Sequence, residues 1–254
     1  MKQLLMTGLI GLALLGCSSE KEKPVQTDEP TYTLIFIDKS VSVNVNQAFV
    51  NQKYTQEISN LIEANLHTKG DKVEVYFIHD NTSKARALSQ SVRSEMDDVS
   101  NASPTDREAA QAAFDLSLQR EKTMIRQRVL QQLTRQNSSL SNQRTDIWAS
   151  LPVIAKANES GMLVKVYYLS DMLESMQGTG RRDLHENPPR DDAQAEEWAK
   201  ADAGKLKQYT IGSPEVTMVL PFEPNASAKV NNPTVTHYWQ TLFSELGVSS
   251  VEEQ

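Results

Sequence analysis

The feature that most constrains the fold is an alternation of short apolar runs with amphipathic segments, which begins near residue 31. Residues 32–37 read Tyr-Thr-Leu-Ile-Phe-Ile, without the polar alternation of a strand that has one face in water. Such a run is typical of a central strand covered on both faces. Residues 46–66 follow with apolar side chains at helical spacing, and residues 72–79 form a second strand-like run. The pattern predicts a parallel sheet with helical crossovers.

The same alternation continues toward the C-terminus. The apolar spacing predicts a helix at 145–158, a strand at 162–169, a helix at 193–206, a strand at 215–221 and a helix at 233–246. A further helical period covers residues 103–137 and opens with Ser103 and Pro104, a helix-start pattern. We interpret this long helix as an insertion. The predicted fold class is α/β, with a doubly wound, mostly parallel sheet and helices on both faces.

Size and charge limit the organisation and the partners of the chain. A length of 254 residues with 39% hydrophobic content fits one globular domain of ordinary size with appendages. We assign residues 31–248 to this domain and residues 249–254 to a tail. Residues 178–192 lack a hydrophobic pattern and are expected to form a long loop within the domain. The net charge of −7 disfavours a basic phosphate-binding face, so we expect no nucleic-acid partner.

The N-terminal region has the pattern of an exported bacterial protein. Lys2 precedes an apolar run over residues 4–15, which is too short to span a bilayer and ends in Leu-Leu-Gly-Cys17. This ending resembles a bacterial lipobox, which implies a signal peptide at 1–16 and lipidation of Cys17. The alternative is an ordinary secretory peptide with an incidental cysteine.

The remaining N-terminal residues predict a tether and a location. Residues 17–30 then comprise the lipidated cysteine and a polar linker without an apolar period. Cys17 is the single cysteine, so no intrachain disulfide is expected. Ser18 follows it, and in enterobacteria-like sorting a residue other than Asp at this place implies the outer membrane. We therefore expect a lipid-anchored protein of the bacterial cell envelope, on the outer membrane and facing the periplasm.

Oxygen-bearing side chains stand where two of the predicted strands end. Asp38, Ser40 and Ser42 follow the first strand. Asp171 follows a later apolar strand, and Thr145 opens the helix predicted between them. Because the carboxyl ends of parallel strands meet at one edge of the sheet, we expect these five residues to lie close together. Carboxylates and hydroxyls without His or Cys suit Mg²⁺ or Mn²⁺.

These residues carry a resemblance to a known family. Asp-x-Ser-x-Ser after an apolar strand, a later Thr at a helix start and a later strand-ending Asp resemble the metal-ion-dependent adhesion site of the von Willebrand factor A (vWA) domain family, over roughly residues 31–246. The resemblance implies that the metal site comprises Asp38, Ser40, Ser42, Thr145 and Asp171, with the serines as direct ligands and the aspartates acting partly through water. It also implies a protein partner whose Asp or Glu carboxylate completes the coordination. Met172 stands where family members often have Gly.

We therefore expect a membrane-tethered protein-binding module that is not an enzyme. The four histidines are scattered, and the sequence has neither a Gly-x-Ser-x-Gly elbow nor a glycine-rich phosphate loop. One alternative is a metal-dependent phosphoesterase that uses Asp38 and Asp171 with Mg²⁺. Another is a metal-free structural subunit of an envelope complex, in which Asp38 and Thr145 only form caps and turns. Arg144 is then a candidate partner for Asp171 or Asp146.

Overall fold

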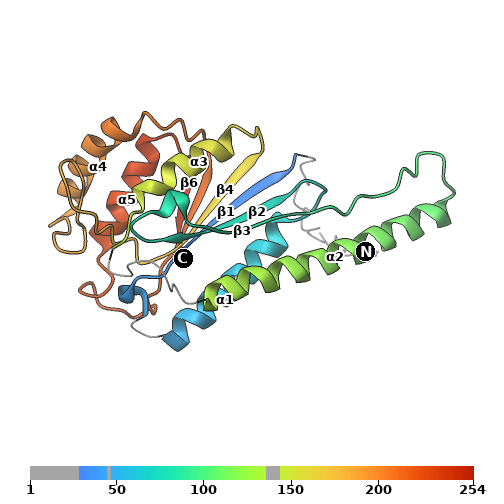
Figure 1. The fold of residues 1–254 in the computed structure, drawn as a ribbon, viewed down its shortest axis with the longest axis horizontal. Helices are drawn as coiled ribbons and strands as arrows, with labels where there is room; N and C mark the ends of the chain where they lie inside the picture. Colours follow the sequence, from blue (N-terminus) through green and yellow to red (C-terminus); the bar gives the residue numbers. More distant parts are fainter. Residues whose placement is uncertain (1–28, 45–46, 136–143) are drawn as a thin grey trace, which may run out of the picture.

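The computed structural model describes residues 29–44, 47–135 and 144–254. Its strands form one six-stranded sheet in the order β3-β2-β1-β4-β5-β6 (Figure 1). Neighbouring strands are parallel, except that β3 runs antiparallel to β2. The strands are β1 (Thr31–Asp38), β2 (Lys72–Ile78), β3 (Arg86–Ser91), β4 (Leu163–Leu169), β5 (Glu215–Val219) and β6 (Ser250–Glu253). The predicted fold class, a doubly wound and mostly parallel α/β sheet, is confirmed.

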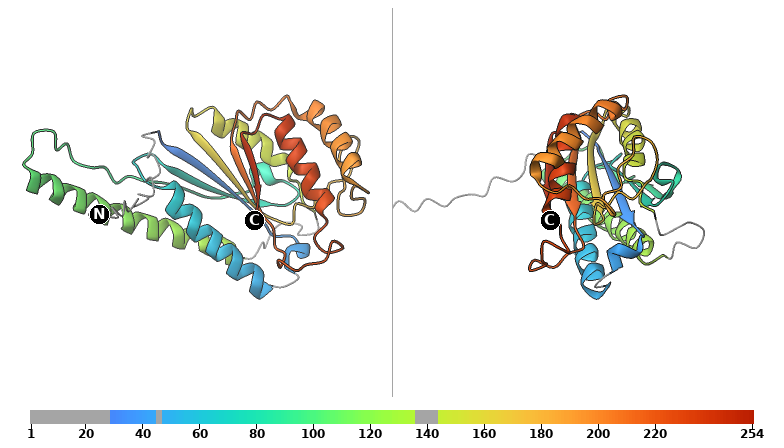
Figure 2. Two further views of the ribbon diagram at one scale, coloured as in Figure 1. Left: turned by 180° about the vertical axis from the view of Figure 1, so that it is seen from behind. Right: turned by 90° about the vertical axis from the view of Figure 1, so that its left-hand side faces the viewer.

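Helices cover both faces of this sheet. They are α1 (Gln47–Asn65), α2 (Pro104–Thr134), α3 (Leu151–Asn158), α4 (Asp192–Leu206) and α5 (Pro233–Glu245). Apolar side chains of α1 and α2 pack in one buried cluster, and those of α3, α4 and α5 pack in the other, on the opposite face. Figure 2 shows the two layers of helices from behind and from the side. Two separate cores therefore fix the sheet between them.

The central strand β1 belongs to both cores. All eight of its residues are buried. Leu34 and Phe36 lie in the cluster with α3, α4 and α5, whereas Ile35 and Ile37 lie in the cluster with α1 and α2. Because successive side chains of a strand point to opposite faces, a strand between two helical layers needs apolar residues at every position. This is why the sequence shows a continuous apolar run here.

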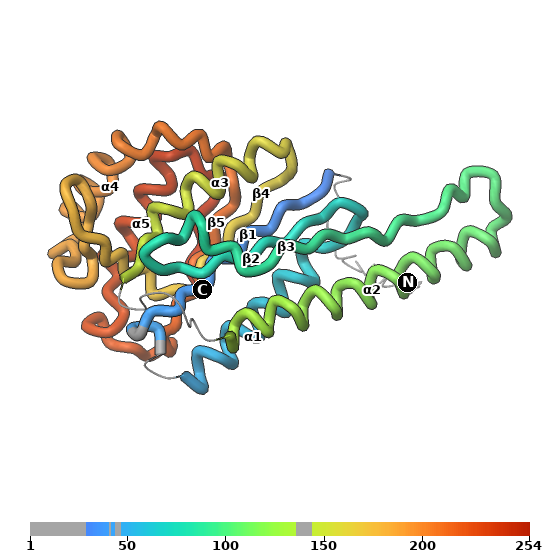
Figure 3. The backbone as a smooth tube through the Cα atoms, viewed as in Figure 1, coloured from blue at the N-terminus to red at the C-terminus, as the bar shows by residue number. Residues whose placement is uncertain are grey.

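Helix α2 is longer than the sheet that it covers. Its 31 residues correspond to about 46 Å at ~1.5 Å per residue. The Ser103 side chain caps its start by accepting a hydrogen bond from the backbone N–H of Asp106. The predicted helix over 103–137 is thus confirmed for its described part, and residues 136–137 lie outside the described residues. The helix and the segment 92–103 project together beyond the sheet (Figures 2 and 3).

Two edge strands were not expected from the sequence. Strand β3 reads Arg-Ala-Leu-Ser-Gln-Ser, with few apolar residues, because it borders the sheet and pairs only with β2. Residues 249–254, which the sequence suggested as a tail, contain β6, which pairs in parallel with β5. Most of its residues are exposed, so it lacks an apolar pattern. Both edge strands are held mainly by backbone hydrogen bonds, and only Ala87, Leu88 and Val251 pack in part against the cores.

The helix predicted from residue 145 begins later than expected. A short 3₁₀ turn, η3 (Trp148–Ser150), comes first, and α3 starts at Leu151 with Pro152 in its first turn. Thr145 therefore precedes the helical turns instead of opening a helix. The carboxylate of Glu174 accepts hydrogen bonds from the backbone N–H groups of Ile147 and Trp148. This contact supplies partners for the first free N–H groups of the turn, a role that only the metal-free alternative gave to Thr145.

Candidate functional site

The site lies at the carboxyl edge of the two central strands. Strand β1 ends at Asp38, and its neighbour β4 is followed by Ser170 and Asp171. The parallel register pairs Ile37 with Leu169, so the residues that follow each strand emerge side by side. Asp38 and Asp171 are each only 4% exposed. Two carboxylates from different strands are therefore buried at one edge.

The Asp38 carboxylate is held through both of its oxygens. Oδ1 accepts a hydrogen bond from the backbone N–H of Ser40 at 2.7 Å. Oδ2 accepts a hydrogen bond from the Ser170 hydroxyl at 2.6 Å. The hydroxyls of Ser40 and Ser42 are 3.0 Å apart. Asp38, Ser40 and Ser42 thus lie together in one hydrogen-bonded group, and Ser170, which was not among the predicted site residues, joins it.

Asp171 completes this group from the neighbouring strand. The backbone N–H of Leu173 donates a hydrogen bond to its Oδ1 at 3.0 Å, and the Ser42 side chain is a further hydrogen-bond partner. Met172, between them, has φ 61, in the left-handed region that glycine adopts most easily. The Trp239 indole N–H donates a hydrogen bond to the Met172 carbonyl at 2.8 Å. The structure therefore holds at Met172 a backbone conformation that favours glycine.

Burial and mutual repulsion perturb both carboxyl groups. Burial, and then the charge of Asp38, raises the pKa of Asp171 to about 7. Burial likewise raises the pKa of Asp38, against the hydrogen bonds from Ser170 and Ser40, which lower it. Two carboxylates that share a buried site resist simultaneous ionisation. A nearby divalent cation would remove this conflict by neutralising both charges.

The donor set fits Mg²⁺ or Mn²⁺ in its chemistry. All its side chains offer oxygen, which hard divalent cations prefer. Among the described residues no group of three or more His, Cys, Asp or Glu side chains is placed to hold a metal ion, so a cation here depends on the hydroxyls of Ser40 and Ser42. The Tyr54 hydroxyl, buried under the same edge, has no hydrogen-bond partner within the described ranges. Such a buried polar atom is unusual and is compatible with a polar ligand nearby.

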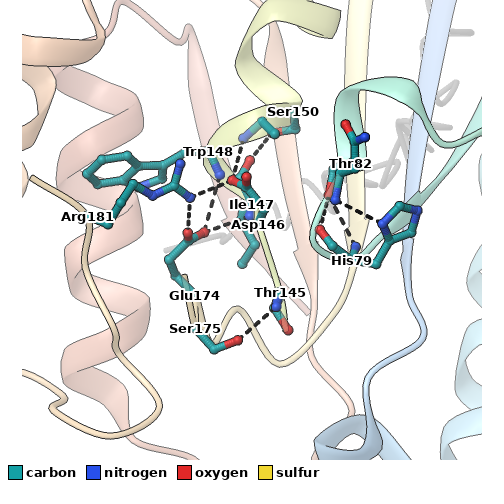
Figure 4. Close-up of polar contacts among 12 residues, drawn as sticks. His79, Thr82, Thr145, Asp146, Ile147, Trp148, Ser150, Glu174, Ser175 and Arg181 are labelled. Atoms are coloured by element: carbon teal, nitrogen blue, oxygen red, sulfur yellow. Dashed lines mark hydrogen bonds and ion pairs between the residues drawn. The ribbon is translucent and has the colours of Figure 1, made fainter. Parts of the chain in front are cut away.

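Thr145 is linked to the loop that follows Asp171. Its backbone N–H donates a hydrogen bond to the Ser175 hydroxyl at 2.8 Å, and its carbonyl accepts one from the Ser175 N–H at 3.0 Å (Figure 4). The Thr145 side chain is 3% exposed. Within the described part of the chain no hydrogen bond joins its hydroxyl to Asp38, Ser40, Ser42 or Asp171. Four of the five predicted residues thus form one group, and Thr145 is held beside the same loop through its backbone.

An ion cluster that the sequence did not predict supports this loop. Arg181 pairs with Asp146 at 2.5 Å and with the fully buried Glu174, and its guanidinium lies 4.8 Å from the ring centre of Trp148 (Figure 4). Burial raises the pKa of Glu174 to about 8 against the attraction of Arg181. The cation that pairs with Asp146 is therefore Arg181 and not Arg144, which is exposed.

Two further contacts define the surroundings of the site. The ammonium group of Lys39 donates a hydrogen bond to the carbonyl of Leu133, in the last turn of α2, and burial lowers its pKa to about 8. The inserted helix thus ends at the carboxyl edge. The loop over residues 178–192 contacts the segment that follows Asp171. The Leu184 N–H donates a hydrogen bond to the Glu174 carbonyl at 2.8 Å, and Asp183 pairs with Ser175 in an isolated antiparallel bridge.

Comparisons with known proteins add likenesses of shape only. No protein-family model and no curated protein matches the sequence. The PilB minor pilin from Streptococcus sanguinis is 11% identical, with a TM-score of 0.43 and coverage of 91% of this chain and 59% of that chain. The pilus adhesin SpaC from Lactobacillus rhamnosus GG is 14% identical, with a TM-score of 0.41 and coverage of 90% of this chain and 28% of that chain. A von Willebrand factor type A protein from Catenulispora acidiphila is 9% identical, with a TM-score of 0.36 and coverage of 84% of this chain and 43% of that chain.

The chain therefore spans less than two thirds of the length of each of these three proteins. Likenesses at these scores carry no argument about function, which rests on the site itself. The lipobox-like segment, Cys17 and the linker predicted up to residue 30 lie outside the described residues, except for residues 29 and 30. Within the described ranges no helix has the length and apolar character needed to cross a bilayer.

Proposed function

We propose that this protein is a membrane-tethered vWA-type binding module that uses Mg²⁺ or Mn²⁺ to capture a carboxylate of a protein partner. The observation that carries the proposal is the buried pair Asp38 and Asp171, joined to Ser40 and Ser42 at the carboxyl edge of the central strands. A pair of buried carboxylates without a cation between them is electrostatically unfavourable. A bound dication would offset this cost, because its charge neutralises both carboxylates.

The residues divide into ligands and supports. Ser40, Ser42 and Thr145 would supply neutral oxygens, while Asp38 and Asp171 would supply the negative charge. When bound, the cation would act as a Lewis acid for an anionic oxygen of the partner, because neutral hydroxyl ligands leave it electrophilic. Ser170 orients Asp38 by its hydrogen bond at 2.6 Å. The chain's own part is thus to hold the oxygens in place and to neutralise the cation only partly.

The position of the site suits a tethered binder. Residues 29 and 30 precede β1 at the amino edge of the sheet, and Asp38 ends β1 at the opposite edge. Eight residues of strand correspond to about 26 Å at ~3.3 Å each. A lipid on Cys17 would therefore hold the protein by the edge away from the site. The carboxyl edge and the loop over 178–192 would face outward, toward a partner.

The proposed metal site is tested by titrating the purified protein with Mn²⁺ and with Mg²⁺. We expect calorimetric binding and a higher thermal midpoint, because a ligand that binds only the folded state stabilises it by mass action. Asp38→Asn should abolish both responses. Asp80→Asn serves as the matched control, since Asp80 follows the neighbouring strand β2 but pairs with His79 instead of joining the site. The proposal would be refuted if millimolar Mn²⁺ and Mg²⁺ gave neither calorimetric binding nor a higher thermal midpoint with the wild-type protein.

Partner capture needs a separate test. The protein, immobilised by its C-terminus, would be exposed to peptides that carry a single Asp or Glu and to the same peptides with Asn or Gln. Binding that requires both the carboxylate and Mn²⁺ supports the mechanism, and chelator should abolish it. Binding that ignores the metal would discard the adhesion-site mechanism. A parallel phosphatase assay examines the enzyme alternative, which gains support only from turnover that depends on Asp38.

A further inference from the structure

Tyr54 differs from the other buried tyrosines of the domain. It lies in α1 with only 1% of its surface exposed, and its hydroxyl has no hydrogen-bond partner among the described residues. By contrast, the Tyr168 hydroxyl lies 2.6 Å from the Ser150 hydroxyl, and the Tyr238 hydroxyl donates to Asp202 at 3.2 Å. Buried polar groups are nearly always hydrogen-bonded, so an exception needs a physical reason.

The location of Tyr54 supplies that reason. Its ring belongs to the same buried cluster as Ile37, Val43 and Leu169. Each of these three residues is the chain neighbour of a residue in the site, namely Asp38, Ser42 and Ser170. The ring thus packs in the same apolar cluster as three residues that adjoin the candidate site in the chain.

The two aspartates act on the phenol electrostatically. Burial raises the pKa of Tyr54 most, and the charges of Asp38 and then Asp171 raise it further. The hydroxyl therefore lies within electrostatic range of both carboxylates, and it keeps its proton at neutral pH. A protonated phenol beside carboxylates is a hydrogen-bond donor.

A hydrogen bond to the aspartate pair would satisfy the Tyr54 hydroxyl. Asp38 and Asp171 are the two buried carboxylates at this edge of the sheet, and hydrogen bonds to a carboxylate are about twice as strong as neutral ones. A bound dication would fix the orientation of both carboxylates, because each would ligate it directly or through water. The Tyr54 hydroxyl would then gain a partner that it otherwise lacks.

We propose that Tyr54 is a further positioning residue of the metal site, whose hydroxyl donates a hydrogen bond to the Asp38–Asp171 pair when a divalent cation is bound. The inference rests on the proposed function and extends it to a residue of α1 outside the predicted motif. It also assigns α1 a role in cation affinity, because the helix carries the donor beneath the site.

The test compares Tyr54→Phe with wild-type protein in calorimetric titrations with Mn²⁺. The substitution removes the hydroxyl and keeps the buried ring. We expect Mn²⁺ affinity to fall about tenfold, as for the loss of one hydrogen bond to a charged group. The thermal midpoint in chelator should stay the same or rise, because the variant loses a buried hydroxyl that has no partner.

Tyr168→Phe is the matched control. Tyr168 is a fully buried tyrosine in the other core, and its hydroxyl is already hydrogen-bonded to Ser150. Its loss should lower the midpoint in chelator and leave Mn²⁺ affinity unchanged. The two variants are therefore expected to show opposite patterns of stability and metal affinity.

Each other outcome overturns the inference in a recognisable way. If wild-type protein and Tyr54→Phe bind Mn²⁺ equally well, the inference is wrong and the proposed function stands. If Tyr54→Phe lowers the metal-free midpoint as Tyr168→Phe does, the hydroxyl has a structural partner and the inference is again wrong. If the wild type binds neither Mn²⁺ nor Mg²⁺, the proposed function fails and the inference fails with it.

Discussion

Replacing Arg181 by Ala should destabilise the domain by releasing the loop over residues 178–192. The Arg181 side chain is 25% exposed and pairs with Asp146, which is 11% exposed, and with Glu174, which is fully buried. It also lies 4.8 Å from the ring centre of Trp148. Removing the guanidinium leaves Glu174 buried without a cation. Breaking a buried ion pair in this way costs about 3–5 kcal/mol when both charges are fully desolvated.

The expected loss here is smaller, for two structural reasons. A quarter of the Arg181 side chain is exposed, so water already weakens the pair. Glu174 keeps its hydrogen bonds from Ile147 and Trp148, and its raised pKa lets it take up a proton when the cation is removed. We therefore expect a loss of about 2 kcal/mol in the free energy of unfolding. For a domain of this size that corresponds to a fall of about 4–8 °C in the thermal midpoint.

The assay is thermal and urea unfolding of wild-type protein, Arg181→Ala and Lys200→Ala. Lys200 forms an exposed ion pair with Glu196 on the surface of α4, so its removal should leave the midpoint unchanged. Limited proteolysis should cut Arg181→Ala within 178–192 sooner than wild type. A midpoint of Arg181→Ala within about 1 °C of the wild type would refute the reasoning, because the buried Glu174 would then not need its cation.

Three further predictions concern the site and the anchor. In chelator the thermal midpoint should fall as the pH rises from about 4 to about 7, because the pKa of Asp171 has its ordinary value in the unfolded chain and is raised to about 7 in the folded protein. A profile that is flat across this window would contradict the reasoning. Thr145→Ala should reduce the rise of the thermal midpoint that Mn²⁺ induces. In chelator the variant should lose about 1 kcal/mol or less of folding free energy, because the backbone hydrogen bonds to Ser175 remain. If Mn²⁺ raises the midpoint of the variant as much as that of the wild type, Thr145 is not part of the site. Cys17→Ala should abolish metabolic labelling with a fatty acid and leave unprocessed precursor, and normal labelling of the variant would disprove the anchor.

The sequence predicts the strand-end residues well because the fold itself brings them together. Asp38 and Asp171 each follow a continuous apolar run, and parallel neighbouring strands end at the same edge. Ser40 and Ser42 are so close in the chain to Asp38 that the short turn after β1 places them there. Chain proximity for the two serines and parallel strand pairing for the two aspartates were sufficient to place these four residues.

The supporting residues could not be predicted in the same way. Glu174 and Arg181 acquire their roles through packing against Ile147 and Trp148, and the sequence contains no periodic signal for that contact. Tyr54 fits the apolar face of α1, so its pattern indicates only core packing. The unpartnered hydroxyl becomes visible only when the helix lies beneath the carboxyl edge. Tertiary burial, and not local pattern, gives these residues their role.

The inserted helix α2 relates the two edges of the sheet. At the carboxyl edge, the Leu133 carbonyl in its last turn accepts a hydrogen bond from the Lys39 ammonium group. Lys39 stands between Asp38 and Ser40 in the chain. Its other end projects beyond the amino edge, where residues 29 and 30 enter β1 (Figure 1). The middle of α2 packs in the buried cluster on this face of the sheet through Ile125 and Val129. The insertion is therefore one continuous helix that extends from the turn after β1, where the candidate ligands lie, past the opposite edge of the sheet.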